Sequence, residues 1–192
     1  GWFFGREEIT QKLTLALEQR GRLVIAGPSG AGKTSLVQAG LIPELKILRP
    51  LEVLRMQAGR EPLARLAALV SGLAGSDAAV TADDVRQKPG LVGERLRQHT
   101  KATKKRVLVQ VDALEEVITE EASAADVELF GLALEGLRDD ATRNVLLVMA
   151  VRDEYLGRLP RLSRALESAL RDAEFLGPPT RAAMLMALVR PV

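Results

Sequence analysis

The residues with the clearest chemical meaning form a glycine-rich run, Gly27-Pro28-Ser29-Gly30-Ala31-Gly32-Lys33-Thr34, directly after the apolar run 23–26. Glycines allow a loop to close around an anion with its N–H groups pointing inward, and a helix starting behind the loop directs the positive end of its dipole at the same place. The spacing therefore predicts a P-loop that binds a nucleoside triphosphate. A glycine-rich turn without a ligand is the alternative, but the apolar run before the loop and the helix-forming residues 35–39 after it favour the P-loop.

Two side chains at the end of this run predict specific contacts with the nucleotide. Lys33 is expected to reach the β- and γ-phosphates and so to take part in catalysis, while the Thr34 hydroxyl is expected to bind Mg²⁺. The nucleotide contacts expected from this region are Gly27, Pro28, Ser29, Gly30, Ala31, Gly32, Lys33, Thr34 and Ser35.

A group of acidic residues follows the apolar run 107–111. Asp112 ends that run, and a carboxylate at the end of a buried strand is typical of the acid that holds Mg²⁺ beside a P-loop. Glu115 and Glu116 follow, and either carboxylate could polarise a water for attack on the γ-phosphate. The alternative is that both acids only stabilise the N-terminus of a helix beginning near residue 113.

Arg152 follows the apolar run 145–151, so it should emerge at the same edge of the sheet as the P-loop. We predict that its guanidinium senses the γ-phosphate and contributes to catalysis. Its alternative role is an ion pair with Asp153, Glu154 or one of the acids after Asp112.

The elements that must position these side chains are five short apolar runs separated by helix-like segments. The runs around Val109 and Val148 are continuous rather than alternating, which is typical of strands buried on both faces of a parallel sheet. We therefore predict a three-layer α/β fold with a mainly parallel five-stranded sheet flanked by helices. The expected strands are 23–26, 51–56, 107–111, 145–151 and 173–176.

Composition limits the remaining function classes. The 192 residues predict a single domain, and 27 Lys plus Arg against 25 Asp plus Glu give a nearly balanced charge that does not favour a nucleic-acid partner. The absence of cysteine excludes disulfides and thiolate chemistry and is typical of a cytoplasmic protein. No apolar run is long enough for a membrane span, and His99, the only histidine, is expected to be solvated or to lie at a helix C-terminus.

These residues together resemble the STAND class of signalling NTPases, and within it the bacterial group called novel STAND NTPase 1. The segment 27–43 is similar to the P-loop and following helix of that family, and Asp112-Ala113-Leu114-Glu115-Glu116 resembles its extended acidic motif. The segment 4–8 resembles the family's N-terminal stretch over the nucleotide base, which implies Gly5 and Arg6 as nucleotide contacts. The segment 175–178 resembles the strand leading to the family's helical lid, which implies a further contact from Pro178.

The resemblance implies that the chain is the nucleotide core of a longer protein, with 178–192 as the beginning of a helical lid and with self-association or further domains as partners. It also implies ATP or ADP with Mg²⁺ as cofactors, and Arg152 looks like the family's sensor arginine. The chain departs from the family at Ala113 and Leu114, where the family usually has Gln and an aromatic residue, and at Glu154-Tyr155, where it favours Asp-Phe. These departures bear on the hydrolysis rate more than on binding.

Three other readings remain as alternatives. A GTP-binding switch usually carries an Asn-Lys-x-Asp element, which nothing here resembles, so adenine is preferred. A small-molecule kinase would need an acceptor pocket and a basic lid, whereas the acids after Asp112 indicate activation of water. A DNA-associated AAA-type ATPase would use Lys101, Lys104, Lys105 and Arg106 as a phosphate-binding patch, although such a run more often forms a solvated connection into a strand.

Overall fold

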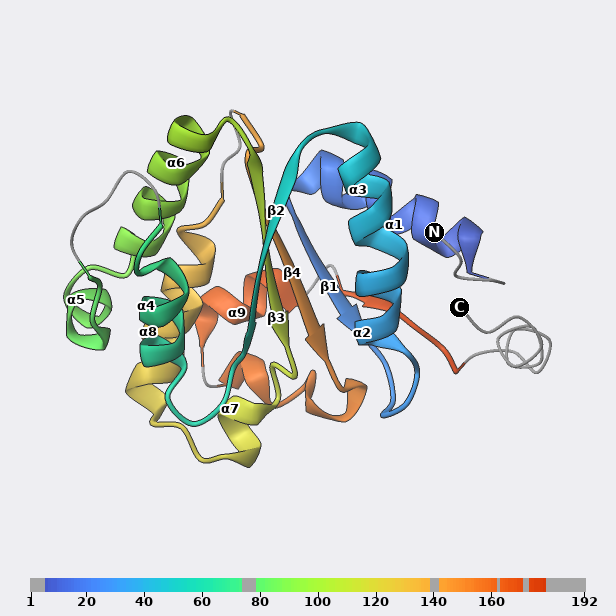
Figure 1. Cartoon of the computed structure of the whole chain (residues 1–192). Coiled ribbons are helices and arrows are strands. Elements are labelled where there is room, and N and C mark those ends of the chain that lie inside the picture. The colour runs from blue at the N-terminus through green and yellow to red at the C-terminus, as the bar shows by residue number, and fades with distance from the viewer. Residues whose placement is uncertain (1–5, 74–78, 139–141, 162, 171–172, 179–192) are drawn as a thin grey trace.

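A computed structural model describes residues 6–73, 79–138, 142–161, 163–170 and 173–178, which form one sheet between two layers of helices (Figure 1). All strands pair in parallel, in the order β2-β3-β4-β1-β5. The predicted five-stranded α/β fold is therefore confirmed. The strands are β1 (Arg22–Ala26), β2 (Leu51–Gln57), β3 (Arg106–Asp112), β4 (Val145–Val151) and β5 (Glu174–Phe175).

The central strands are apolar without alternation because both faces of the sheet are covered. On β4, Leu147 and Met149 belong to one apolar core, while Leu146 and Val148 belong to the core on the opposite face. Every residue of β4 is buried. A strand with two buried faces has no position for a solvated side chain, which explains the continuous apolar runs in the sequence.

The helices divide between the two faces of the sheet (Figure 1). One face packs against α1 (Glu7–Arg20) and the helix behind the P-loop. On the other side lie α4 (Pro62–Val70), α5 (Ala82–Gln87), α6 (Leu91–Thr103), α8 (Ala124–Glu135) and α9 (Arg164–Leu170). The short helices α7 (Glu116–Thr119), η2 (Asp153–Tyr155) and η3 (Leu159–Arg161) follow β3 and β4. Among the described residues, no helix is long and apolar enough to cross a lipid bilayer.

Two helix starts are stabilised by side chains of the preceding residue. The Thr81 hydroxyl accepts a hydrogen bond from the Asp84 N–H, and the Asp84 carboxylate accepts one from the Thr81 N–H in return. The Ser123 hydroxyl accepts one from the Asp126 N–H at the start of α8. Both pairs have the hydroxyl-to-acid spacing of helix caps, so these starts are specified locally.

The helix behind the P-loop changes its hydrogen-bond pattern before a proline. It consists of α2 (Lys33–Ser35), the π-helical segment η1 (Leu36–Leu41) and α3 (Ile42–Leu48). Ile42 donates to the carbonyl of Val37, five residues back rather than four. Pro43 has no N–H to donate and its ring crowds the carbonyl four residues earlier, so the wider π-helical turn accommodates the proline without ending the helix.

Two polar residues lie deeper than the sequence suggests. His99 is only 4% exposed, and its Nε2 lies 2.9 Å from a carboxylate oxygen of Glu52, so the expected solvated position is wrong. Arg106 is 2% exposed and its Nη1 donates to Glu18 over 2.7 Å. Each side chain is buried because a carboxylate from another element reaches it, a contact that no local pattern reveals.

We predict that Gly27→Ala destabilises the fold at the junction of β1 and β5. A Cβ atom on Gly27 would meet the carbonyl oxygen of Leu176, whose own N–H donates to Ala26 over 2.7 Å, so the two backbones would have to separate. We expect the free energy of unfolding to fall by about 1–3 kcal/mol in urea denaturation.

Gly177→Ala is the matched control, because a Cβ atom at Gly177 would meet nothing within 4 Å. Its unfolding free energy should change by no more than about 0.5 kcal/mol. Equal losses in the two variants would contradict the close approach at Gly27.

Candidate functional site

The P-loop joins the carboxyl end of β1 to the start of α2, where two glycines make the turn possible. Gly30 and Gly32 have φ values of +76° and +83°, a region that side chains with a Cβ rarely adopt. The Lys33 ammonium lies against the loop, donating to the carbonyl oxygens of Gly27 at 2.7 Å and Pro28 at 3.0 Å. The loop thus holds a positive charge at the N-terminus of a helix, as phosphate binding requires.

Thr34, in α2, and Asp112, at the end of β3, are in direct contact. The Thr34 hydroxyl donates to the Asp112 carboxylate at 2.8 Å to Oδ2 and lies 3.1 Å from Oδ1. Asp112 also accepts a hydrogen bond from the N–H of Ala113, a residue with a φ of +51°. A hydroxyl and a carboxylate side by side are the hard oxygen donors that Mg²⁺ takes while keeping several waters, so these residues fit the metal that the P-loop implies.

Glu115 and Arg152 form an ion pair in which the carboxylate is buried and the arginine side chain is 45% exposed. The Glu115 side chain is only 7% exposed, and its Oε1 lies 3.1 Å from Nε of Arg152. Its Oε2 accepts a hydrogen bond from the Arg152 main-chain N–H, also at 3.1 Å. The carboxylate therefore holds both the backbone and the side chain of one arginine, whereas Glu154 approaches the same guanidinium only at 3.9 Å. Of the ion-pair partners that the sequence offers Arg152, the better one is thus Glu115.

Glu116 points elsewhere. Its Oε2 accepts a hydrogen bond from the N–H of Gly59 at 3.1 Å, which ties α7 to the loop after β2. Burial raises the pKa of Glu116 above its usual value, and the nearby Glu120 carboxylate raises it further. The two adjacent glutamates therefore occupy different environments, a distinction that the sequence does not make.

Arg6 approaches the P-loop from the N-terminal side. Its Nη2 donates to the Gly177 carbonyl at 3.2 Å, and its Nη1 lies 3.9 Å from the position that a Cβ atom on Gly32 would occupy. Burial lowers the pKa of Arg6. Pro178 is exposed beyond Gly177, while Gly5 lies outside the described residues, as does all of the expected lid except Pro178. Arg6 is thus bonded to the segment after β5 and lies beside the P-loop.

The site residues at or after the carboxyl ends of β1, β3 and β4 border one cleft of about 400 Å³. Glu115 lines it and, within the described part of the chain, Glu116 does not. Gln57 and Ala113 were not predicted, although Gln57 ends β2 opposite Asp112 and the position of strand ends could have indicated it. Gly27, Pro28 and Ala31 shape the loop without lining the cleft. Its lining residues are Ser29, Gly30, Gly32, Lys33, Thr34, Ser35, Gln57, Asp112, Ala113, Glu115 and Arg152.

The family described as Novel STAND NTPase 1 matches residues 1–192. The chain belongs to this family. A comparison with curated proteins finds no match. The resemblance inferred from the P-loop and the acidic motif is confirmed.

Solved structures with a similar fold include proteins described with bound nucleotides and a Walker-type ATPase. The Aeropyrum pernix ORC2 protein (ADPNP-ADP complexes) has a TM-score of 0.63 at 14% identity, covering 97% of this chain and 51% of that chain. The Walker-type ATPase PABY2304 of Pyrococcus abyssi has 0.55 at 18%, covering 97% and 57%. The replication initiator DnaA bound to AMPPCP and single-stranded DNA has 0.53 at 16%, covering 97% and 51%.

These likenesses concern the fold alone, since every identity is below one in five. The STAND NTPase chain spans about half the length of the structures that it matches. Family and fold together identify it as a nucleotide-binding NTPase domain.

We predict that Glu115→Ala lowers the free energy of unfolding by about 1–3 kcal/mol, because the Arg152 N–H and Nε each lose a buried acceptor. Glu154→Ala removes a carboxylate that is 62% exposed and farther from the same arginine. This variant should change the free energy of unfolding by less than about 0.5 kcal/mol. Urea denaturation of both variants checks the difference, and a larger loss in Glu154→Ala would contradict the assigned pairing.

Proposed function

We propose that this NTPase domain binds ATP with Mg²⁺, hydrolyses it slowly, and acts as the nucleotide switch of a multidomain signalling protein. The observation that carries the proposal is the single cleft that Lys33, Thr34, Asp112, Glu115 and Arg152 share. A cation on the P-loop, a pair of oxygen donors and a second cation are the groups that phosphoryl transfer requires around a triphosphate.

In this proposal each part of the cleft has one task. The P-loop N–H groups and Lys33 hold the β- and γ-phosphates, and Thr34 and Asp112 hold Mg²⁺, directly and through its waters. When bound, Mg²⁺ neutralises charge that develops on the phosphate oxygens. Binding would separate the Thr34 hydroxyl from the Asp112 carboxylate, since both oxygens then face the metal.

We assign Arg152 to the γ-phosphate and Glu115 to water activation. Oε1 of Glu115 is occupied by the Arg152 guanidinium, so it is poorly placed to accept a proton from water while that pair persists. A γ-phosphate that draws the guanidinium away would release Oε1, while Oε2 stays on the Arg152 N–H. The same movement of the Arg152 guanidinium would thus detect the γ-phosphate and free Glu115 to act as the general base.

We propose slow turnover because a switch domain can depend on a further cation from outside the chain, which is withheld until the protein assembles. An arginine supplied by a neighbouring molecule or domain can raise the rate of phosphoryl transfer by about 10³–10⁵. Self-association or the remaining domains of a longer cytoplasmic protein would then control hydrolysis. The expected lid from residue 178 onward, with Gly5, Arg6 and Pro178 as further nucleotide contacts, remains part of this proposal.

Nucleic acid is a weaker candidate partner, although DnaA with single-stranded DNA is among the similar folds. Arg106, one of the four cations of the sequence's basic run, is buried against Glu18 and cannot take part in a surface patch. Lys101, Lys104 and Lys105 are exposed, but they precede β3 and so lie at the opposite edge of the sheet from the P-loop. We therefore keep ATP rather than DNA as the proposed ligand.

We predict that Lys33→Ala and Asp112→Ala each weaken Mg-ATP binding at least tenfold, since charge-assisted hydrogen bonds contribute about 1.5–3 kcal/mol. Lys46→Ala, which removes an exposed lysine from α3, should bind as the parent does. Calorimetry with ATP and GTP checks both the binding site and the preference for adenine over guanine. Equal affinity in Lys33→Ala and the parent would overturn the P-loop assignment, and a preference for GTP would favour the alternative GTP-binding switch.

We predict that Glu115→Gln slows single-turnover ATP hydrolysis about 10²–10⁴-fold without abolishing ATP binding, since a neutral amide is too weak a base to accept the proton of water. Glu116→Gln is the matched control and should retain most of the rate, because Glu116 is bonded to Gly59 outside the cleft lining. The reverse order of effects would exchange the two roles, and an unchanged rate in both variants would reduce the acidic pair to helix stabilisation.

A further inference from the structure

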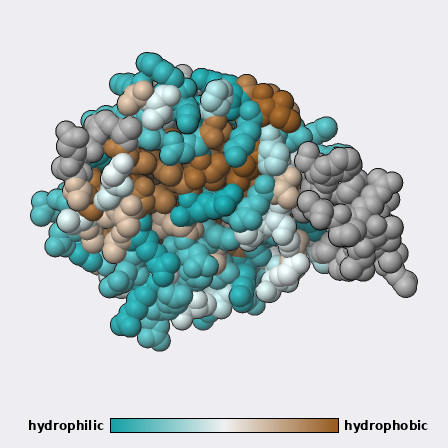
Figure 2. Space-filling model, in the orientation of Figure 1, coloured by the Kyte–Doolittle hydropathy of each residue, from teal (hydrophilic) through white to brown (hydrophobic). Residues whose placement is uncertain are grey.

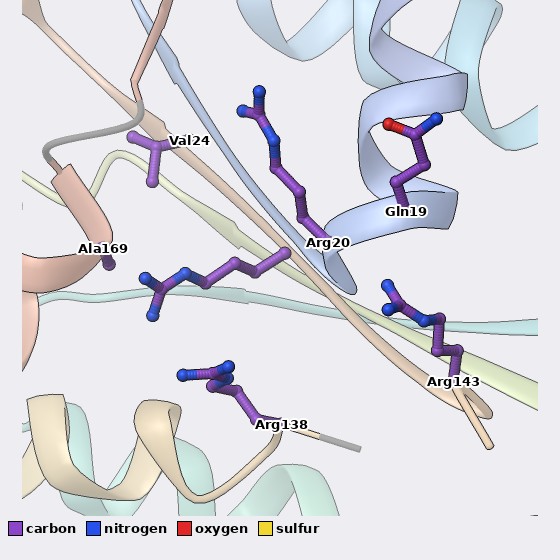
Figure 3. Close-up of a pocket in the computed structure, with 7 residues that line it drawn as sticks. Gln19, Arg20, Val24, Arg138, Arg143 and Ala169 are labelled. Atoms are coloured by element: carbon purple, nitrogen blue, oxygen red, sulfur yellow. The ribbon is translucent and has the colours of Figure 1, made fainter. Parts of the chain in front are cut away.

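Four arginines border a second pocket at the opposite end of the sheet. The pocket, of about 250 Å³, is lined by Arg20, Arg22, Arg138 and Arg143 together with Gln19, Val24 and Ala169. Figure 3 shows Arg20 on the end of α1, Arg138 beyond α8 and Arg143 before β4, so the side chains come from separate elements. Arg22 is the first residue of β1. Residues distant in sequence thus place guanidinium groups around one hollow.

The carboxylates near this pocket are shared between cations. Glu135 pairs with both Arg22, at 2.9 Å, and Arg138, at 3.1 Å. Glu174 pairs with Lys12 at 2.8 Å and lies 3.7 Å from Arg20. Each of these two carboxylates is therefore shared between two cations.

The fourth arginine of the pocket, Arg143, donates a hydrogen bond to a main-chain carbonyl group. Arg143 donates to the carbonyl oxygen of Glu18 at 3.2 Å, while the carboxylate of Glu18 is taken by Arg106 at 2.7 Å. Arg143 itself has a φ of +50°, which an arginine adopts only at a cost in conformational energy. The pocket therefore brings four guanidinium groups to one hollow, where Glu135 and Glu174 each lie near two cations.

This pocket is separate from the nucleotide cleft. It lies at the amino end of β1, whereas the P-loop leaves the carboxyl end, about 16 Å away along a five-residue strand. Among the residues that the structure describes, none lines both hollows. A nucleotide on the P-loop would thus leave the arginine pocket accessible to another ligand.

We propose that the arginine pocket binds a second, small ligand that carries two or more phosphate groups. Guanidinium groups present planar pairs of donors that match phosphate oxygens and remain charged at any physiological pH. The volume of about 250 Å³ accommodates a diphosphate-sized group and excludes a nucleic-acid duplex. The inference does not depend on nucleotide binding at the P-loop.

The probe is inorganic pyrophosphate without Mg²⁺, titrated by calorimetry into Lys33→Ala, which weakens the competing P-loop site. In that background we add Arg20→Gln or Arg138→Gln, whose side chains are 48% and 44% exposed, so neither removal should unfold the chain. Each variant is expected to bind pyrophosphate about tenfold more weakly, the loss expected from one charge-assisted hydrogen bond. Circular dichroism verifies that both variants are folded.

Arg55→Gln in the same background is the matched control, because Arg55 is exposed on β2, at the far edge of the sheet from β5. It removes the same charge and should leave the affinity unchanged. Undetectable pyrophosphate binding in Lys33→Ala, or equal weakening by Arg55→Gln, would overturn the proposal. Binding of single-stranded DNA that the pocket variants abolish, with no pyrophosphate binding, would overturn it in favour of a nucleic-acid contact.

Discussion

The candidate site depends on the parallel arrangement of β1, β4 and β3 as neighbours in the sheet. Parallel strands bring their carboxyl ends to one edge, and β4 lies between β1 and β3. The arginine that follows β4 therefore emerges between the P-loop and Asp112. An antiparallel partner in the middle would have carried Arg152 to the opposite edge, and no cleft would combine a phosphate loop, a metal-binding acid and a second cation.

The apolar cores make that arrangement rigid enough to be useful. β4 has no exposed residue, and its two faces belong to two different cores. The polar side chains at its end thus rest on an element that cannot shift without disturbing both layers. At the rim of the cleft, Ala113 takes a positive φ directly after Asp112. A backbone conformation that costs energy by itself can persist there because the packed sheet holds it in place.

The pairs at this rim are also the interactions that a ligand would have to rearrange. Thr34 is bonded to Asp112, Lys33 to its own loop, and Arg152 to Glu115. The charged side chains of the cleft are therefore bonded to other groups of the site, and phosphates and a metal would exchange these bonds rather than meet unpaired charges. Apolar side chains also reach the surface of the molecule, where they form a band between polar regions in the view of Figure 2.

Much of the fold and half of the site follow from local sequence. The P-loop, the five strands, the helix caps at Thr81 and Ser123, and the positions of Asp112 and Arg152 at strand ends all arise from spacing within short windows, because backbone geometry and apolar periodicity act over a few residues. Only the tertiary structure decided which partner each charge takes. It paired Glu115 rather than Glu116 with Arg152, buried His99 beside Glu52 and Arg106 against Glu18, and gathered Arg20, Arg22, Arg138 and Arg143 around one hollow. Charges separated by tens of residues meet only through the order of the strands, and that order is set by the packing of the whole sheet.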